Sequence, residues 1–133
     1  MSVFLDTNIV IFLVERTPDI GTAAARRVEE LIAEGQRLVA SDLVRMECRV
    51  RPLKLKDTTT LTEFDAYFDS EDIDVVAISA AVCDRASAIR AEYGFRPMDS
   101  LHLAAALEHG CERFLTRDLR LQGFAGINIE ILS

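Results

Sequence analysis

Short apolar runs alternate with longer segments of mixed polarity along the whole chain. Five of the short runs have the composition of β-strands, namely residues 3–5, 38–40, 74–78, 113–116 and 127–131. The segments between them are long enough for helices. In residues 22–34, for example, Val28, Leu31 and Ile32 recur at the i, i+3, i+4 spacing of one helix face.

Glycine and serine residues mark the predicted helix ends. Gly35, Gly94 and Gly110 each follow a helical segment, where a glycine commonly ends the helix. Ser41 and Ser79 each follow a predicted strand, and their hydroxyl groups can cap the next helix. The alternation predicts an α/β fold with a mostly parallel sheet and helices on both faces. Such sheets bind ligands at the carboxyl ends of their strands.

Length and composition predict a single globular domain spanning residues 1–133. Half of the residues are hydrophobic and 28% are charged, as in ordinary soluble proteins. The longest apolar stretch, residues 3–14, is interrupted by polar residues and is too short to cross a bilayer, and no basic segment precedes it. We expect a cytoplasmic protein with no membrane association. The three cysteines agree with a cytoplasmic protein, because they are odd in number and far apart in the sequence. We expect all three to be thiols in or near the core: Cys48, Cys83 and Cys111.

The formal net charge of -7 argues against a general nucleic-acid coat, but the charges are unevenly distributed. A basic cluster precedes the acidic stretch 57–74 and consists of Arg45, Arg49, Arg51, Lys54 and Lys56. One interpretation is a phosphate-binding edge, for which Arg96 and Arg117 are the next candidates. The other is that the cluster pairs with the acidic stretch and ties two helices together.

Two aspartates directly follow predicted strands. Asp6 comes after an apolar strand and precedes more apolar residues, so its carboxylate needs compensation for lost solvation. A helix N-cap is the simpler role, but its place at a strand exit favours ligand binding. Asp118 follows the strand that ends at Thr116, where an ordinary turn residue is the alternative.

Two further acids lie in predicted helices. Glu47 shares a helix face with Leu43 and Val50, and an acid on an apolar stripe is usually paired or ligating. A salt bridge to Arg51 is the alternative. Asp99 opens a predicted helix, for which a capping role is sufficient by itself.

The shared placement of these acids predicts a cation. Each like-charge pair at about 5 Å costs about 3 kcal/mol at an effective dielectric constant of about 20. A divalent ion reverses the sign of that energy. Oxygen-only ligands favour Mg²⁺ or Mn²⁺, and such ions can activate water and neutralise charge on a scissile phosphate.

Four segments occur in a recognisable order: Leu5-Asp6-Thr7-Asn8, Ser41 with Glu47 six positions later, Asp99-Ser100-Leu101-His102, and Leu115-Thr116-Arg117-Asp118. With these motifs the whole chain resembles the PIN domain. In length and order of motifs it is similar to VapC-type toxins, the ribonuclease half of toxin–antitoxin pairs.

The resemblance implies a three-layer α/β/α domain with a five-stranded, mostly parallel sheet, and Mg²⁺-dependent endonucleolytic cleavage of RNA. It implies that Asp6, Glu47, Asp99 and Asp118 form the catalytic metal site, although family members often carry Asn where this chain has Asp118. Thr116 would lie beside them as a hydrogen-bonding hydroxyl, or simply end its strand. A homodimer and inhibition by a small antitoxin whose tail enters the active-site groove are also implied.

Other interpretations remain. His102 lies one helical turn after Asp99, and a packing or hydrogen-bonding role is favoured over a catalytic one. A PIN nuclease of RNA processing without an antitoxin, or a catalytically idle binding module, are the alternative functions. A haloacid-dehalogenase-like phosphatase requires a second aspartate where Asn8 stands, and a receiver domain requires one where Ile78 and Ser79 stand, so both are excluded.

Overall fold

The computed structural model describes all 133 residues, and its strands lie close to those predicted. The strands are β1 (Ser2–Leu5), β2 (Arg37–Ser41), β3 (Asp74–Val76), β4 (Arg113–Thr116) and β5 (Asn128–Ile131). The helices are α1 (Thr7–Glu15), α2 (Ile20–Ala33), α3 (Asp42–Leu55), α4 (Thr58–Asp69), α5 (Ala80–Tyr93) and α6 (Pro97–Glu108), with a 3₁₀ helix, η1 (Leu119–Gly123). No helix is both long and apolar enough to cross a membrane.

All five strands are parallel and lie in the order β3-β2-β1-β4-β5. The chain first adds β2 and β3 on one side of β1, and then returns to add β4 and β5 on the other side. The order therefore reverses between β1 and β4. Ligands in open α/β sheets bind outside the carboxyl ends of the strands at such a switch point.

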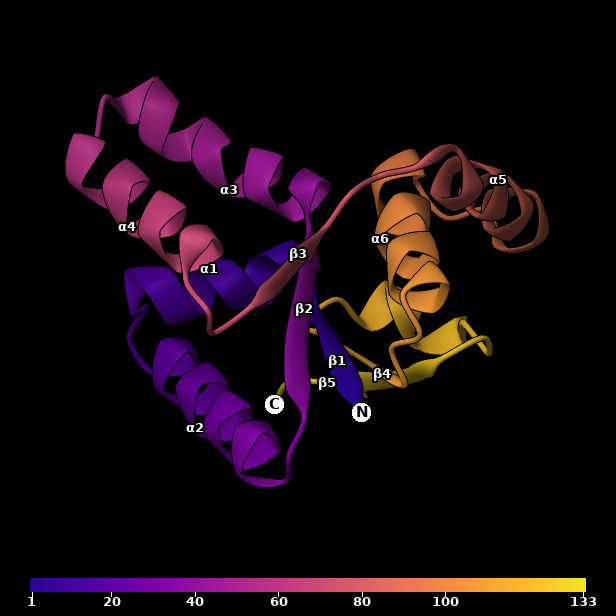
Figure 1. Ribbon diagram of the computed structural model, residues 1–133, viewed down its shortest axis with the longest axis horizontal. Helices are drawn as coiled ribbons and strands as arrows, with labels where there is room; N and C mark the ends of the chain where they lie inside the picture. Colours follow the sequence, from indigo (N-terminus) through magenta and orange to yellow (C-terminus); the bar gives the residue numbers. More distant parts are fainter.

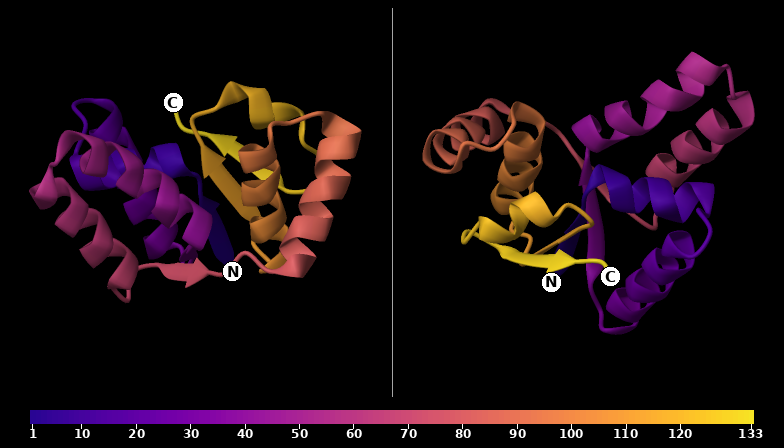
Figure 2. Two further views of the ribbon diagram at one scale, coloured as in Figure 1. Left: turned by 90° about the horizontal axis from the view of Figure 1, so that it is seen from above. Right: turned by 180° about the vertical axis from the view of Figure 1, so that it is seen from behind.

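The helices form layers on the two faces of the sheet, as predicted. Figure 1 shows α1, α2 and the α3–α4 pair on one side of the strands and α5 with α6 on the other. The two further views in Figure 2 show the same separation. Reversal of the strand order requires this change of face, because right-handed crossovers in opposite directions place their helices on opposite sides.

The predicted helix caps agree with the structure. Gly35, Gly94 and Gly110 have φ values of 86°, 72° and 70°, in the left-handed region that glycine adopts most easily. Ser41 and Ser79 accept hydrogen bonds from Val44 N and Val82 N, and so cap α3 and α5. The prediction for α6 was wrong by two residues. The helix begins at Pro97, whose fixed φ suits a first helical position, and Asp99 lies within its first turn.

Apolar side chains from β1 and β4 form the centre of the core. Phe4 and Phe114 are fully buried and stack with their ring centroids 5.3 Å apart. Cys48 and Cys111 are buried as predicted. Cys83 is exposed on α5, so its prediction as a core or near-core thiol was wrong: this helix presents Cys83 to solvent while Val82 and Ala86 face inward.

An ion-pair network ties α2 to the strands at one side of the sheet. Glu130 on β5 accepts hydrogen bonds from Arg27 Nε at 2.6 Å and Nη2 at 2.9 Å, and also from Arg113 on β4. The hydrogen bond from Arg27 is the main cause of a lowered pKa of Glu130. The carboxylate therefore stabilises the folded state at neutral pH, and this contribution is lost as the pH falls below the ordinary glutamate pKa of 4.5.

We predict that Glu130→Gln lowers the free energy of unfolding at pH 7 by about 2 kcal/mol, the scale of a hydrogen bond to a charged group. Urea denaturation of both proteins at pH 7 and pH 3.5 measures the difference, which should shrink at the lower pH. Glu112→Gln, a change at an exposed acid without an ion pair, is the matched control. A difference that is the same at both pH values would contradict the role of the charge.

Candidate active site

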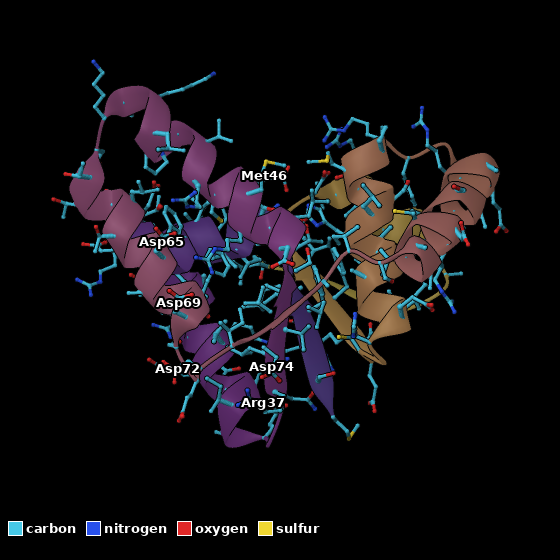
Figure 3. The ribbon with its side chains drawn as sticks, turned by 45° about the horizontal axis from the view of Figure 1, so that its top comes forward. Arg37, Met46, Asp65, Asp69, Asp72 and Asp74 are labelled. Atoms are coloured by element: carbon cyan, nitrogen blue, oxygen red, sulfur yellow. The ribbon has the colours of Figure 1, made fainter.

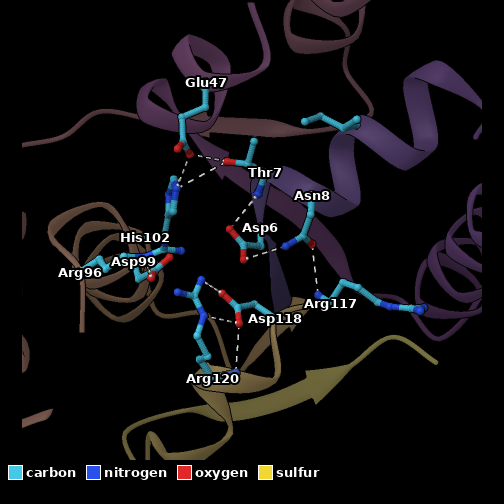
Figure 4. A pocket seen from close by; sticks show the side chains of 11 residues that line it. Asp6, Thr7, Asn8, Glu47, Arg96, Asp99, His102, Arg117, Asp118 and Arg120 are labelled. Atoms are coloured by element: carbon cyan, nitrogen blue, oxygen red, sulfur yellow. Dashed lines mark hydrogen bonds and ion pairs between the residues drawn. The ribbon is translucent and has the colours of Figure 1, made fainter. Parts of the chain in front are cut away.

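A cavity of about 410 Å³ lies beyond the carboxyl ends of β1 and β4, at the switch point of the sheet. Figure 4 shows its charged and polar side chains in close-up. The cavity brings together all four acids predicted from the sequence. Its lining consists of Asp6, Thr7, Asn8, Ile11, Glu47, Arg96, Asp99, His102, Arg117, Asp118 and Arg120.

Asp6 is both a helix cap and a site residue. Its Oδ1 accepts a hydrogen bond from Thr7 N at 2.8 Å, which caps α1, and its Oδ2 accepts one from the Thr116 hydroxyl at 2.7 Å. The residue is only 5% exposed, and burial raises the pKa of Asp6 despite these hydrogen bonds. Asp6 therefore has the N-cap role considered from the sequence, and the same side chain also lines the cavity.

Thr116 links the carboxyl ends of the neighbouring strands β1 and β4. The same buried hydroxyl that donates to Asp6 accepts a hydrogen bond from Asp118 N at 3.0 Å. Asn8 strengthens this link, since its Oδ1 accepts from Arg117 N at 3.1 Å. Thr116 thus makes the hydrogen bond to a carboxylate that the family resemblance implied, whereas Asn8 had been given no role of its own.

Glu47 is held from two sides. Its Oε1 lies 2.6 Å from Thr7 Oγ1 and 2.6 Å from His102 Nε2. Partial burial opposes ionisation, but the hydrogen bonds from His102 and Thr7 outweigh it and lower the pKa of Glu47. Burial lowers the pKa of His102, yet the hydrogen bond to Glu47 and the nearby carboxylates raise it overall. His102 therefore has the hydrogen-bonding role favoured from the sequence.

The predicted surroundings of Glu47 were wrong in two respects. Val50, expected on the same apolar stripe, is 44% exposed, because α3 buries the opposite face, formed by Val44, Cys48 and Pro52. The alternative salt bridge to Arg51 does not form. The partners that do bind Glu47 come from α1 and α6 and are 40 and 55 residues away, so helical periodicity gave no sign of them.

Asp99 and Asp118 are each paired with an arginine. Arg96 Nε lies 3.2 Å from Asp99 Oδ2, and Arg120 donates from Nε to Asp118 Oδ1 at 2.9 Å and from Nη2 to Asp118 Oδ2. The hydrogen bond from Arg120 is the main cause of a lowered pKa of Asp118. Arg120 was missed in the sequence analysis, although its position two residues after Asp118 was a signal that it shares this turn.

The chemistry of the four carboxylates fits a divalent cation, because oxygen ligands are those that Mg²⁺ and Mn²⁺ prefer. In this arrangement no three acidic, histidine or cysteine side chains lie close enough together to hold an ion. Arg96, Arg120 and His102 instead supply the countercharge for Asp99, Asp118 and Glu47. Asp6 alone among the four has no basic side chain bonded to it.

Two members of the basic cluster, Arg45 and Arg49, are paired with acids on α4. Arg49 Nε lies 2.9 Å from Asp65 Oδ1, and Arg45 Nη1 lies 2.9 Å from Asp69 Oδ1. Figure 3 shows both aspartates along α4, which runs beside α3. For Arg45 and Arg49, these contacts favour the interpretation that the cluster ties two helices together. The cations that line the cavity are Arg96, Arg117 and Arg120.

Residues 3–127 match the PIN domain family, and the chain belongs to that family. A search of curated protein sequences gave no match. Among solved structures, the chain is similar to one in the VapBC2 complex of Rickettsia felis bound to promoter DNA, with a TM-score of 0.82, 18% identity and full coverage of both chains.

Two other solved structures are similar over nearly their whole length. One is the DNA-bound VapBC of Salmonella typhimurium, with a TM-score of 0.80, 21% identity and coverage of 100% of this chain and 99% of that one. The other is VapC20 of Mycobacterium tuberculosis, described as a toxin that cleaves the sarcin-ricin loop, with a TM-score of 0.73, 17% identity and coverage of 96% and 99%. At these identities the likeness establishes a shared fold.

We predict that Thr116→Val destabilises the protein by about 1–3 kcal/mol at pH 7, because a buried carboxylate loses its hydroxyl donor and a backbone N–H loses its acceptor. The pKa of Asp6 should also rise, since the lost hydrogen bond lowers it. Urea denaturation and an NMR titration of Asp6 in EDTA measure the two effects. Thr116→Ser keeps the hydroxyl and should leave the pKa of Asp6 unchanged, so equal pKa values in the two variants would refute this role.

Proposed function

We propose that this protein is a metal-dependent endoribonuclease, the toxin component of a VapBC-type toxin–antitoxin pair. The observation that carries the proposal is the convergence of Asp6, Glu47, Asp99 and Asp118 on one cavity from four distant segments of the chain. Membership of the PIN domain family supports nuclease activity. The likeness to chains of toxin–antitoxin complexes supports the biological role.

The four carboxylates are the residues that would hold Mg²⁺ or Mn²⁺. Such an ion, when bound, supplies activation of water and neutralisation of charge on the phosphate. Asp6 is suited to this task, because it is buried, has no basic partner and is fixed through both oxygens by Thr7 N and Thr116. Like-charge repulsion around it falls when a cation is present.

The remaining cavity residues orient the acids and the substrate. Thr116 fixes Asp6 and the start of the turn that carries Asp118, while Thr7 and His102 fix Glu47. The substrate is a polyanion, and local positive charge is needed to bind it to a chain of net charge -7. Arg117 is a candidate for that contact, since it lines the cavity without pairing to an acid.

Two partners complete the proposal: a second copy of the chain, forming a homodimer, and a small antitoxin that inhibits the nuclease. A PIN nuclease of RNA processing without an antitoxin is the alternative function. A catalytically idle module is disfavoured by the site itself, because four acids that repel one another around one cavity serve no purpose in a protein that only binds a partner.

Metal dependence is the first test of the proposal. We expect EDTA to abolish cleavage of a mixed RNA substrate and Mg²⁺ or Mn²⁺ to restore it, measured by gel electrophoresis. Asp99→Asn should be inactive with either ion. Its thermal melting in EDTA should match or exceed that of the wild type, because a like charge has been removed from the cavity. Full cleavage after exhaustive chelation would falsify the assignment of the site.

The toxin role predicts growth arrest when the chain is expressed without an antitoxin. Wild-type expression should stop growth and degrade cellular RNA, while Asp99→Asn at the same expression level should not. Growth curves and total RNA profiles measure both effects. If purified wild-type protein cleaves RNA but its expression is as harmless as that of the variant, the RNA-processing alternative is favoured.

A further inference from the structure

Two of the four cavity carboxylates are paired with arginines that come from their own turns of the chain. Arg120 binds both oxygens of Asp118, from Nε and from Nη2, whereas Arg96 binds Asp99 through a single contact of 3.2 Å. A pair of parallel bonds between a guanidinium and a carboxylate is the strongest geometry for such an ion pair. Arg120 therefore occupies the oxygens through which Asp118 would bind a cation.

The position of this pair suits exchange with solvent. The side chain of Asp118 is 18% exposed, while that of Arg120 is 57% exposed, so the arginine is the more solvent-accessible partner of the pair. Two further carboxylates of the cavity, Asp99 and Asp6, also attract Arg120 electrostatically. The Arg120 side chain can move into water without breaking an ion pair other than the one with Asp118.

Arg117 lines the same cavity and provides a contrast. Its Nη1 donates to Leu132 O at 3.3 Å, and it has no ion pair with any acid. Both Arg117 and Arg120 are exposed, and both contribute one positive charge within two residues of Asp118 in the sequence. They differ in the direct bonds to a carboxylate, which only Arg120 makes.

We propose that Arg120 is a built-in counter-ion that competes with the divalent cation for Asp118. This inference rests on the proposed function of the site. In the metal-free protein Arg120 neutralises Asp118 and lessens repulsion among the acids. When a cation binds, the guanidinium is displaced, because a cation bound to Asp118 repels it and takes at least one of its two oxygens. Arg120 thus sets the metal affinity of the site and acts through Asp118 as a positioning residue.

The test is a comparison of Mn²⁺ affinity, measured by isothermal titration calorimetry in the absence of RNA, among wild type, Arg120→Gln, Arg120→Lys and Arg117→Gln. In Arg117→Gln the loss of one nearby positive charge should tighten Mn²⁺ binding by only about twofold, because solvent and salt screen the repulsion between that charge and the ion. Arg120→Gln also removes direct competition, so we expect binding about tenfold tighter than in wild type. Arg120→Lys keeps the charge without the paired bonds, so its Mn²⁺ affinity should lie between those of wild type and Arg120→Gln.

A second measurement distinguishes competition from a purely structural role. In EDTA, Arg120→Gln should melt at a lower temperature than wild type, and saturating Mn²⁺ should raise its melting temperature more than it raises that of wild type. Equal tightening in Arg120→Gln and Arg117→Gln, or weaker binding in Arg120→Gln, would overturn the inference while leaving the nuclease assignment intact. Absence of Mn²⁺ binding to the wild type would overturn the metal site of the proposed function as well.

Discussion

The parallel pairing of β1 with β4 is the interaction on which the arrangement of the site depends. In this register Leu5 lies beside Leu115, and Asp6 N continues the ladder by donating to Leu115 O at 3.0 Å. The residues that follow the two strands therefore leave the sheet side by side. Phe4 and Phe114, stacked one position earlier, fix the same register from within the core. A slip by one residue would turn these side chains to the wrong face.

The second constraint is electrostatic. Four carboxylates around one cavity would repel one another, and the chain offsets this with Arg96, Arg120 and His102, each bonded to a different acid. Asp6 is the exception, and burial raises its pKa. The site thus holds three acids in local ion pairs and a fourth that relies on hydroxyl and backbone donors. That asymmetry distinguishes the acid at the centre of the sheet from those on the surrounding helices and turn.

Local features were predictable from the sequence, because they depend on neighbouring residues. Helix caps such as Ser41 and Gly94, and acids at strand exits such as Asp6, follow from short patterns and from the geometry of parallel sheets. The partners of Glu47 and the pairing of Arg49 with Asp65 depend on how helices meet in space, and no pattern within one helix reveals them. Arg120 was overlooked because a charged side chain in a turn usually faces solvent, whereas this one bonds to Asp118.

The cavity also has an unusual lining, since Ile11 is its only hydrophobic residue. A molecule that enters it gains little from removing apolar surface from water, which is the main source of affinity in most small-molecule pockets. Whatever binds there must be held by charge and by hydrogen bonds. Dissolved ions weaken these electrostatic forces, whereas they leave apolar contacts intact or strengthen them. Occupancy of this cavity therefore depends on ionic strength more strongly than occupancy of an apolar pocket does.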